Sequence, residues 1–391
     1  MLDEVIQNLK THLEPLFARI KQIQAMFSTS KDVYGDLMGV DLDDSSILAV
    51  QLSNPVGVAR VSRVGAIALS TGVITEDAIT DNAAMTVALK KMITTGQIRV
   101  KNIAMAMPGN KVAIKEIKVD GPLSDSEAEA HAWQEARRTF PELAKNLFLD
   151  FVQVERPGKQ YVLVVVFCRR EDILPRVETL QQAGLTPKIM EVDYYALERA
   201  YPLFASQLPS EHVDQYLAVI DFNPHSILFL VMYKKTVIFR SRQAYTGDVL
   251  VPLVQRAMQL EVSVGKVKPL TLTPMAASLQ TPLQINIENH TDFLNEDQKT
   301  HILMTIRRLF QSFYSENPGK VIAHIAFSGR CALLPEITQY LGKSLEIPVK
   351  TVNPLLALKV GEHVDVNRTM KIGPALTVSC GLALRGIPLW K

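Results

Sequence analysis

The chain has 391 residues, with 42 basic and 40 acidic side chains and a formal net charge of +2. That length exceeds what one hydrophobic core usually serves, so two domains or two halves are expected. Hydrophobic residues make up 47% and charged residues 21% of the chain, which excludes a disordered protein, and the balance of charge without a Lys/Arg block excludes an electrostatic nucleic-acid surface.

The cysteines and apolar runs predict a reduced, cytosolic protein. Cys168, Cys331 and Cys380 stand far apart, and no secretory leader is recognisable before the first domain. The longest apolar stretches, such as Tyr161–Cys168 and Ile227–Tyr233, fall far short of the roughly 20 residues that a membrane span needs. They are expected to be buried strands.

The first 32 residues are predicted to form a separate unit, an amphipathic helix followed by a linker at Ser28–Asp32. Apolar residues recur at three- and four-residue steps from Val5 to Phe27, which predicts one apolar stripe on a helix that Pro15 bends. Such a helix either docks on a membrane surface or a partner, or packs on its own domain. Because basic residues are not enriched on it, the membrane interpretation is the weaker one.

From Val33 onward strands and helices alternate, which predicts an α/β protein with mixed sheets. Ser124 followed by Glu127 is the pattern of a capping box, so a helix is expected over about 125–140. A loop rich in Pro and Ser at 207–213 separates two halves. The remaining expected strands are 58–69, 103–108, 111–119 and 188–192, and the remaining expected helices are 77–94, 171–183, 194–206, 246–264 and 296–315.

One hairpin pattern occurs twice. Asp41 ends an apolar strand and precedes Ser46-Ile47-Leu48 and a second apolar strand, and Asp221 precedes Ser226-Ile227-Leu228 in the same way. The separation of about 180 residues is too long for a solenoid, so a whole domain is duplicated. Two facing halves form a cleft in which an Asp of each hairpin holds hydrated Mg²⁺ and the turn N–H groups cradle phosphates, as in actin-like ATPases. Each hairpin alone is equally consistent with a plain β-turn.

Six sequence blocks resemble the PilM family, the actin-like cytoplasmic proteins of type IV pilus assembly, which are themselves similar to the cell-division protein FtsA. The blocks lie in register between about Gly39 and Arg385, and they include "GVDLDDSSILAVQLS", "AMAMPGNKVAIKEIKV", "FSGRCALLPEI" and "GPALTVSCGLALRGI". The resemblance implies an α/β, actin-like ATPase fold with duplicated ribonuclease-H-like halves and four subdomains. These are a first lobe at 33–98 and 167–210, an inserted small subdomain at 99–166, a second lobe at 211–248 and 320–391, and a helical subdomain at 249–319.

The predicted cleft loops depart from the pattern of the family. Asp43 and Asp44 replace a glycine and a small polar residue in the first loop, Pro224 removes an N–H donor from the second, and Arg330 replaces a glycine in the third. Each added carboxylate would oppose a triphosphate by about 1 to 4 kcal/mol at a separation of roughly 4 to 6 Å. The prediction is therefore a degenerate nucleotide cleft with weak or lost ATP and Mg binding and no catalytic residues. An active Mg-ATP-binding ATPase whose nucleotide state controls pilus assembly is the alternative.

Several polar residues of these loops have more than one interpretation. Asp41, Asp43 and Asp44 either attract a divalent ion together or form a solvated acidic turn. Asp193 either helps to hold metal or water, or caps the helix that follows it, and His225 is either a phosphate donor or an exposed loop histidine. Asp41 and Asp221 would hold Mg²⁺ only if ATP binds. The full set predicted for the cleft is Gly39, Asp41, Asp43, Asp44, Ser45, Ser46, Asp193, Asp221, Asn223, Ser226, Gly329 and Arg330.

The resemblance also implies a partner, the N-terminal cytoplasmic tail of a PilN-like protein. The chain would be an adaptor peripheral to the inner membrane, in contact with other platform proteins and the assembly ATPase. The tail would lie as an extended peptide in a groove of the inserted subdomain. A filament-forming protein of the FtsA kind and a platform homologue of a type II secretion or MSHA-type system are further alternatives. Candidate groove residues, about half of which are expected to be core instead, are Ile103, Met105, Met107, Val112, Ile114 and Phe151.

Overall fold

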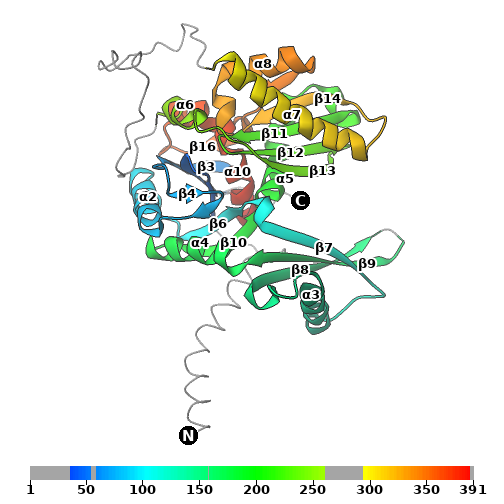
Figure 1. Cartoon of the computed structure of the whole chain (residues 1–391). Coiled ribbons are helices and arrows are strands. Elements are labelled where there is room, and N and C mark those ends of the chain that lie inside the picture. Colours follow the sequence, from blue (N-terminus) through cyan, green and yellow to red (C-terminus); the bar gives the residue numbers. More distant parts are fainter. Residues whose placement is uncertain (1–35, 54–58, 157, 260–293, 388–391) are drawn as a thin grey trace.

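The computed structural model describes residues 36–53, 59–156, 158–259 and 294–387. This part of the chain forms two α/β lobes, each built on a central sheet, and a small three-stranded subdomain that extends from the first lobe (Figure 1). The helix predicted near the N-terminus lies outside the described residues, as does the end of the helix predicted over 246–264. No helix of the described residues is long and apolar enough to cross a membrane.

The first lobe is a mixed sheet of six strands covered by helices on both faces. Apolar residues of α2 (Asn82–Thr95) and α4 (Arg170–Gln182) pack on one face, and those of α5 (Asp193–Phe204) and α10 (Thr377–Ala383) pack on the other. The strand order is β10 (Thr186–Val192), β6 (Asn102–Met107), β1 (Met38–Leu42), β2 (Ser46–Ser53), β3 (Arg60–Ala68) and β16 (Lys359–Val360).

The second lobe repeats this plan with five strands. Its apolar core is closed by α7 (Glu296–Glu316), α8 (Pro335–Leu345) and α6 (Leu250–Ala257). Helix α5 also packs against this sheet, so α5 and α10 lie between the lobes. The strand order is β13 (Thr236–Ala244), β12 (Ser226–Tyr233), β11 (Tyr216–Asn223), β14 (Ile322–Ser328) and β15 (Val349–Thr351).

The two predicted hairpins have the same register. Asp41 faces Leu48 across the antiparallel pair β1–β2, and Asp221 faces Leu228 across β11–β12. Strand β1 then pairs in parallel with β6, as β11 pairs in parallel with β14. The repeat in the sequence is therefore a repeat of strand order, direction and register.

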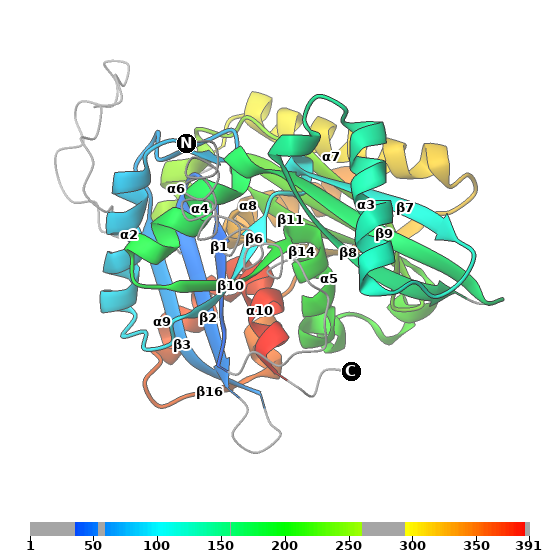
Figure 2. The same ribbon diagram turned by 90° about the horizontal axis from the view of Figure 1, so that it is seen from below.

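The inserted subdomain is a separate sheet in the order β7 (Val112–Val119), β9 (Gln160–Arg169) and β8 (Leu147–Arg156). Helix α3 (Asp125–Thr139) covers the face that is turned away from the second lobe (Figure 2). The predicted capping box of Ser124 and Glu127 is present. The predicted boundary at residue 99 is wrong, because β6 pairs with β1 and β10 in the first sheet and the insertion begins after it.

One predicted boundary in the first lobe is shifted by a turn. The helix expected from Asp77 begins at Asn82, with Asp81 as its N-cap. Asp77 itself lies in the tight turn between β4 (Ile74–Thr75) and β5 (Ala78–Ile79), with φ of +64°. Helical periodicity did not separate this turn from the helix, because Asp is common both in turns and in first helical turns.

Close backbone packing around α10 requires two glycines. A Cβ on Gly39 of β1 would lie 2.1 Å from the Ser379 carbonyl oxygen, and a Cβ on Gly381 of α10 would lie 1.9 Å from the Ala196 carbonyl oxygen of α5. Both neighbours are backbone atoms, which cannot move aside without shifting the helix. Gly39, predicted as a cleft residue, therefore has a packing role, since it lets α10 approach the first sheet.

We expect the substitution Gly39→Ala to lower the free energy of unfolding by at least about 1 to 3 kcal/mol, the usual cost of overpacking a core. Urea denaturation followed by circular dichroism measures this. Gly121→Ala is the matched control, because a Cβ there meets nothing within 4 Å and the change should stay within about 0.5 kcal/mol. Equal effects of the two substitutions would contradict the packing role.

Candidate functional site

Three loops predicted to bind nucleotide meet between the lobes. The first is the turn between β1 and β2, the second is the turn between β11 and β12, and the third follows β14 at Gly329. Gly329 has φ of +90°, and a Cβ there would lie 2.5 Å from the Phe222 carbonyl oxygen, so the third loop can lie against β11 only with glycine at this position. This close approach directs the next residue, Arg330, toward the other two loops.

The Arg330 side chain is the centre of the site. Its exposed fraction is 1%, which makes it one of the largest fully buried side chains of the described residues. Nη1 lies 2.8 Å from Oδ2 of Asp41 and 3.1 Å from Oδ1 of Asn223, and Nε donates to Oγ of Ser46 at 2.7 Å. Nη2 is within 3.3 Å of the Ser46 carbonyl oxygen. One second-lobe guanidinium thus binds the first turn of the opposite lobe.

Asp43 completes this arrangement from within the first turn. Its Oδ1 accepts hydrogen bonds from the backbone N–H groups of Ser45 and Ser46, both at 2.9 Å, and from the Ser45 hydroxyl at 2.6 Å. The same oxygen lies 3.2 Å from Nε of Arg330. Asp43, one of the two carboxylates predicted to repel a triphosphate, is therefore paired with a cation of the chain itself, and the prediction of a solvated acidic turn is wrong.

Asp221 is placed in the cleft as predicted but is fully engaged there. It accepts hydrogen bonds from the Ser328 hydroxyl and from the amide of Asn223, both at 2.8 Å. Burial and the nearby Asp41 carboxylate raise the pKa of Asp221 to about 7. Both oxygens of Asp221 are thus used within the chain, and no group of three His, Cys, Asp or Glu side chains suited to a metal occurs in the described ranges. Ser226 starts β12 opposite Asn223.

Further second-lobe side chains bind the edges of the first turn. Gln255 of α6 donates to the carbonyl oxygens of Ser45 at 2.7 Å and Leu69 at 3.0 Å. His225 pairs with Asp44 of the first turn and, through Nε2 at 2.7 Å, with Asp248. Burial alone would lower the pKa of His225, but the two carboxylates outweigh it and raise the pKa to about 9. His225 is thus a cationic link between the lobes and not a free loop histidine.

Asp193 belongs to a different network and not to the three-loop site. Its Oδ1 accepts the N–H groups of Gly109 and Tyr194, and its Oδ2 accepts from Nε of Arg242 at 3.0 Å. Arg242 of β13 also binds both carboxylate oxygens of Asp77, at 2.7 and 2.8 Å. Burial raises the pKa of Asp193 to about 6 despite Arg242. The ion pair between Arg242 and Asp77 was not predicted, because nothing in the sequence indicates that an arginine on one strand and an aspartate in a distant turn are in contact.

Half of the predicted groove residues are core residues. Ile103, Met105 and Met107 of β6 have exposed fractions of 0% and form part of the first-lobe core, so these three do not line a groove. This agrees with the expectation that about half of the six candidates are core. Val112 packs against the same core, and Phe151 packs beneath α3. Val112 and Ile114 both lie on the face of the inserted sheet opposite α3, and of these two only Ile114 does not pack against the first-lobe core.

That uncovered face has an apolar row with one carboxylate. Ile114, Val166 and Asp150 lie opposite one another across β7, β9 and β8, so their side chains share the face. The next row contains Glu116, Val164 and Val152. Ile114, Val166, Val164 and Val152 keep intermediate exposure. Oδ2 of Asp150 is buried without a hydrogen-bond partner among the described residues, and burial raises the pKa of Asp150 to about 6.

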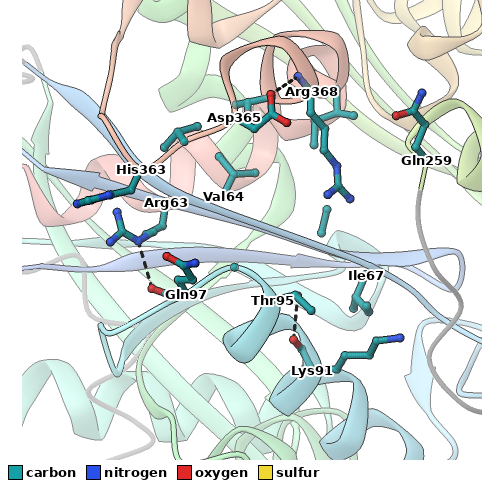
Figure 3. Close-up of a pocket in the computed structure, with 15 residues that line it drawn as sticks. Arg63, Val64, Ile67, Lys91, Thr95, Gln97, Gln259, His363, Asp365 and Arg368 are labelled. Carbon is teal, nitrogen blue, oxygen red and sulfur yellow. Dashed lines mark hydrogen bonds between the residues drawn. The ribbon is translucent and has the colours of Figure 1, made fainter.

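A cavity of about 340 Å³ lies apart from the three-loop site, between β3, α2 and α9 (Val366–Ile372). Figure 3 shows the Arg368 side chain extending into it from α9, while Nε of Arg63 donates to the Gln97 carbonyl oxygen at 3.1 Å. Its lining is mixed: basic side chains such as Lys91 and His363 stand beside aliphatic ones such as Val64 and Ile67. None of the cleft or groove residues predicted from the sequence lines this cavity.

The duplicated lobes and the three loops between them define a class of protein, the actin-like ATPase fold. In this member of the class, side chains of the protein join the cleft loops. The solved "PilM-PilN type IV pilus biogenesis complex" is similar, with a TM-score of 0.68 and 20% identity over 90% of this chain and 98% of that chain. The family described as type IV pilus assembly protein PilM matches residues 39–387, and the chain belongs to this family. The resemblance to the PilM family and the actin-like fold, both predicted from the sequence, are therefore confirmed.

Two more distant solved structures also match. The ethanolamine utilization protein EutJ from Carboxydothermus hydrogenoformans has a TM-score of 0.47 and 12% identity over 89% of each chain. A protein with an actin-like ATPase fold and unknown function from Bacteroides thetaiotaomicron has a TM-score of 0.40 and 7% identity over 87% of this chain and 96% of that chain.

The His225 link predicts a pH dependence of stability. Its pKa in the folded protein, about 9, exceeds the value of about 6.5 in an unfolded chain. The stabilisation is therefore complete below pH about 6.5 and is lost as the pH rises through about 9. We expect at most about 1 kcal/mol, because the His225 and Asp44 side chains remain 29% and 20% exposed.

The measurement is the free energy of unfolding of the wild type and of His225→Gln between pH 6 and 10, read from urea denaturation. The advantage of the wild type over the variant should shrink across this window and vanish at its alkaline end. Parallel curves for the two proteins would contradict the role of His225.

The network around Arg242 predicts a larger loss in the free energy of unfolding, which can be measured at a single pH. Arg242→Ala leaves the buried Asp193 carboxylate without its cation, which costs about 3 to 5 kcal/mol in buried pairs. Arg240→Ala on the same strand is the control, because its pair with Glu198 is 34% and 33% exposed and should cost about 1 kcal/mol or less. Urea denaturation compares the two variants, and similar losses would show that Arg242 is not specially coupled to the first lobe.

Proposed function

We propose that this chain is a non-catalytic adaptor of a type IV pilus assembly platform and binds the N-terminal cytoplasmic tail of a PilN-like protein. Membership of the PilM family supports the pilus role, and the similar solved complex contains PilM with PilN. The adaptor would act in the cytoplasm and reach the inner membrane through that tail. Other platform proteins and the assembly ATPase are its further proposed partners.

The observation that carries the proposed binding site is the uncovered face of the inserted sheet. Helix α3 packs on one face and buries Leu163, Val165 and Phe167 there. On the opposite face Ile114, Val164 and Val166 remain half-buried, and no other element of the inserted subdomain covers them. An extended peptide that crosses these strands can place alternate side chains on the two apolar rows. The face lies beside the first lobe and is turned toward the second (Figure 1).

Asp150 gives the proposed site its polarity. A buried carboxylate oxygen without a hydrogen bond is costly, and a cationic or N–H donor of the ligand would satisfy it. We therefore propose that the tail presents apolar side chains to Ile114 and Val166 and a Lys, Arg or backbone N–H donor to Asp150. On binding such a donor, the raised pKa of Asp150 should return toward its ordinary acidic value.

Tail binding is further proposed to need no nucleotide, with ATP binding weak or lost. The groups of the cleft loops that would bind a phosphate or its metal ion already have partners within the chain: Arg330 for Asp41, and Asp43 for the N–H groups of Ser45 and Ser46. A phosphate would have to displace these interactions before it could bind. Addition of Mg²⁺ and ATP should therefore leave the affinity for the tail unchanged.

The test is isothermal titration of the full chain with a synthetic peptide of the N-terminal tail of the PilN-like protein of the same organism. Ile114→Asp places a charge in the apolar row and should weaken binding at least about tenfold, which corresponds to 1.4 kcal/mol. Glu129→Lys, on the exposed side of α3, is the control and should bind as the wild type does. No binding by the wild type, or equal binding by Ile114→Asp, would overturn the proposed site.

A further inference from the structure

We propose that Asp43 and Arg330 together occupy a latent nucleotide-phosphate site, with the Asp43 carboxylate in the place of a phosphate and the Arg330 guanidinium in the place of its metal ion. The proposal rests on the proposed function, in which ATP binding is weak or lost and the tail binds without nucleotide. It assigns the site a ligand class, a nucleoside triphosphate with Mg²⁺, and names the two side chains whose removal would admit that ligand.

The Asp43 half of the pair fills an anion-binding turn. The consecutive N–H groups of Ser45 and Ser46 converge on one oxygen of Asp43, each at 2.9 Å, and the Ser45 hydroxyl adds a third bond at 2.6 Å. Consecutive N–H groups that converge in a turn form a concave site of the kind that binds phosphate oxygens. In this chain the anion is a side chain of the turn itself, so an incoming phosphate finds these donors already used.

The Arg330 half of the pair supplies the cation. Its Nη1 lies 2.8 Å from Oδ2 of Asp41 at the end of β1, and its Nε lies 3.2 Å from Oδ1 of Asp43. A metal ion bound with a phosphate bridges a protein carboxylate and a phosphate oxygen in the same way. Arg330 therefore joins the strand-end aspartate to the anion of the turn. Because the guanidinium comes from the opposite lobe, this bridge also holds the lobes together without a ligand.

Exclusion of a triphosphate follows from occupied space and occupied donors. Arg330 has an exposed fraction of 1% and is closely surrounded by Asp41, Ser46 and Asn223. Removal of Arg330 alone would leave the Asp43 carboxylate on the turn N–H groups, and removal of Asp43 alone would leave the guanidinium in the cleft. The double substitution Asp43→Gly with Arg330→Gly removes one charge of each sign, empties the space and frees both N–H groups.

The test is fluorescence anisotropy of N-methylanthraniloyl-ATP with Mg²⁺, titrated with the full chain and competed with unlabelled ATP. The double glycine variant should bind at least about tenfold more tightly than the wild type, in a manner that requires Mg²⁺ and is reversed by ATP. Arg330→Gly alone should bind no better than the wild type. The matched control is Asp43→Gly with Arg330→Met, which keeps the cleft filled and should not bind.

Three results would overturn the proposal: competed Mg·ATP binding by the wild type, no binding by a double glycine variant that still unfolds cooperatively, or equal binding by the methionine control. If the double glycine variant does not fold, backbone amide hydrogen exchange of residues 43–47 in the wild type tests the proposal instead. These amides should be protected from exchange without ligand, and Mg·ATP should not change their exchange rates. Rapid exchange would overturn the proposal. Tail titration of the wild type is a separate measurement, whose failure would remove the adaptor role but not this site.

Discussion

A buried guanidinium must have its charge and its hydrogen-bond donors satisfied, and this requirement shapes the whole interlobe site. Arg330 is tolerable at 1% exposure only because Asp41 and Asp43 neutralise it and Ser46 and Asn223 take its remaining donors. Those partners come from turns that are far apart in the sequence. The pairing therefore depends on the equal registers of the two hairpins, which bring both turns to the same end of the facing sheets.

The boundary between the lobes has opposite charges on its two sides. In the ion pairs across this boundary the first lobe supplies the carboxylates and the second lobe supplies the cations, although the whole chain is nearly neutral. Such complementarity fixes the relative orientation of two surfaces more than it adds to their affinity. The acidic partners are Asp41, Asp43, Asp44, Asp77 and Asp193, and the basic partners are Arg330, His225 and Arg242.

Local features of this fold were predictable from the sequence, and long-range pairings were not. The capping box at Ser124 and the duplicated hairpins depend on residues a few positions apart, and both occur as predicted. The placement of Arg330 among the cleft loops was also predicted, but its partners were not, because the choice of a partner almost 290 positions away leaves no pattern in the sequence. Strand β6 was assigned to the wrong sheet for a similar reason: its apolar run fits any buried strand.

The position of α10 has a consequence for the order in which the chain can fold. This helix comes from the C-terminal end of the described residues, yet it packs against β1 through Gly39 and donates from the Ser379 hydroxyl to the Leu48 carbonyl oxygen at 3.1 Å. A newly made N-terminal half therefore lacks a layer of its own core until the ribosome has released residues 377–383. We therefore expect the first lobe to complete its folding only after synthesis of α10, with the part of the sheet face that α10 covers exposed until then.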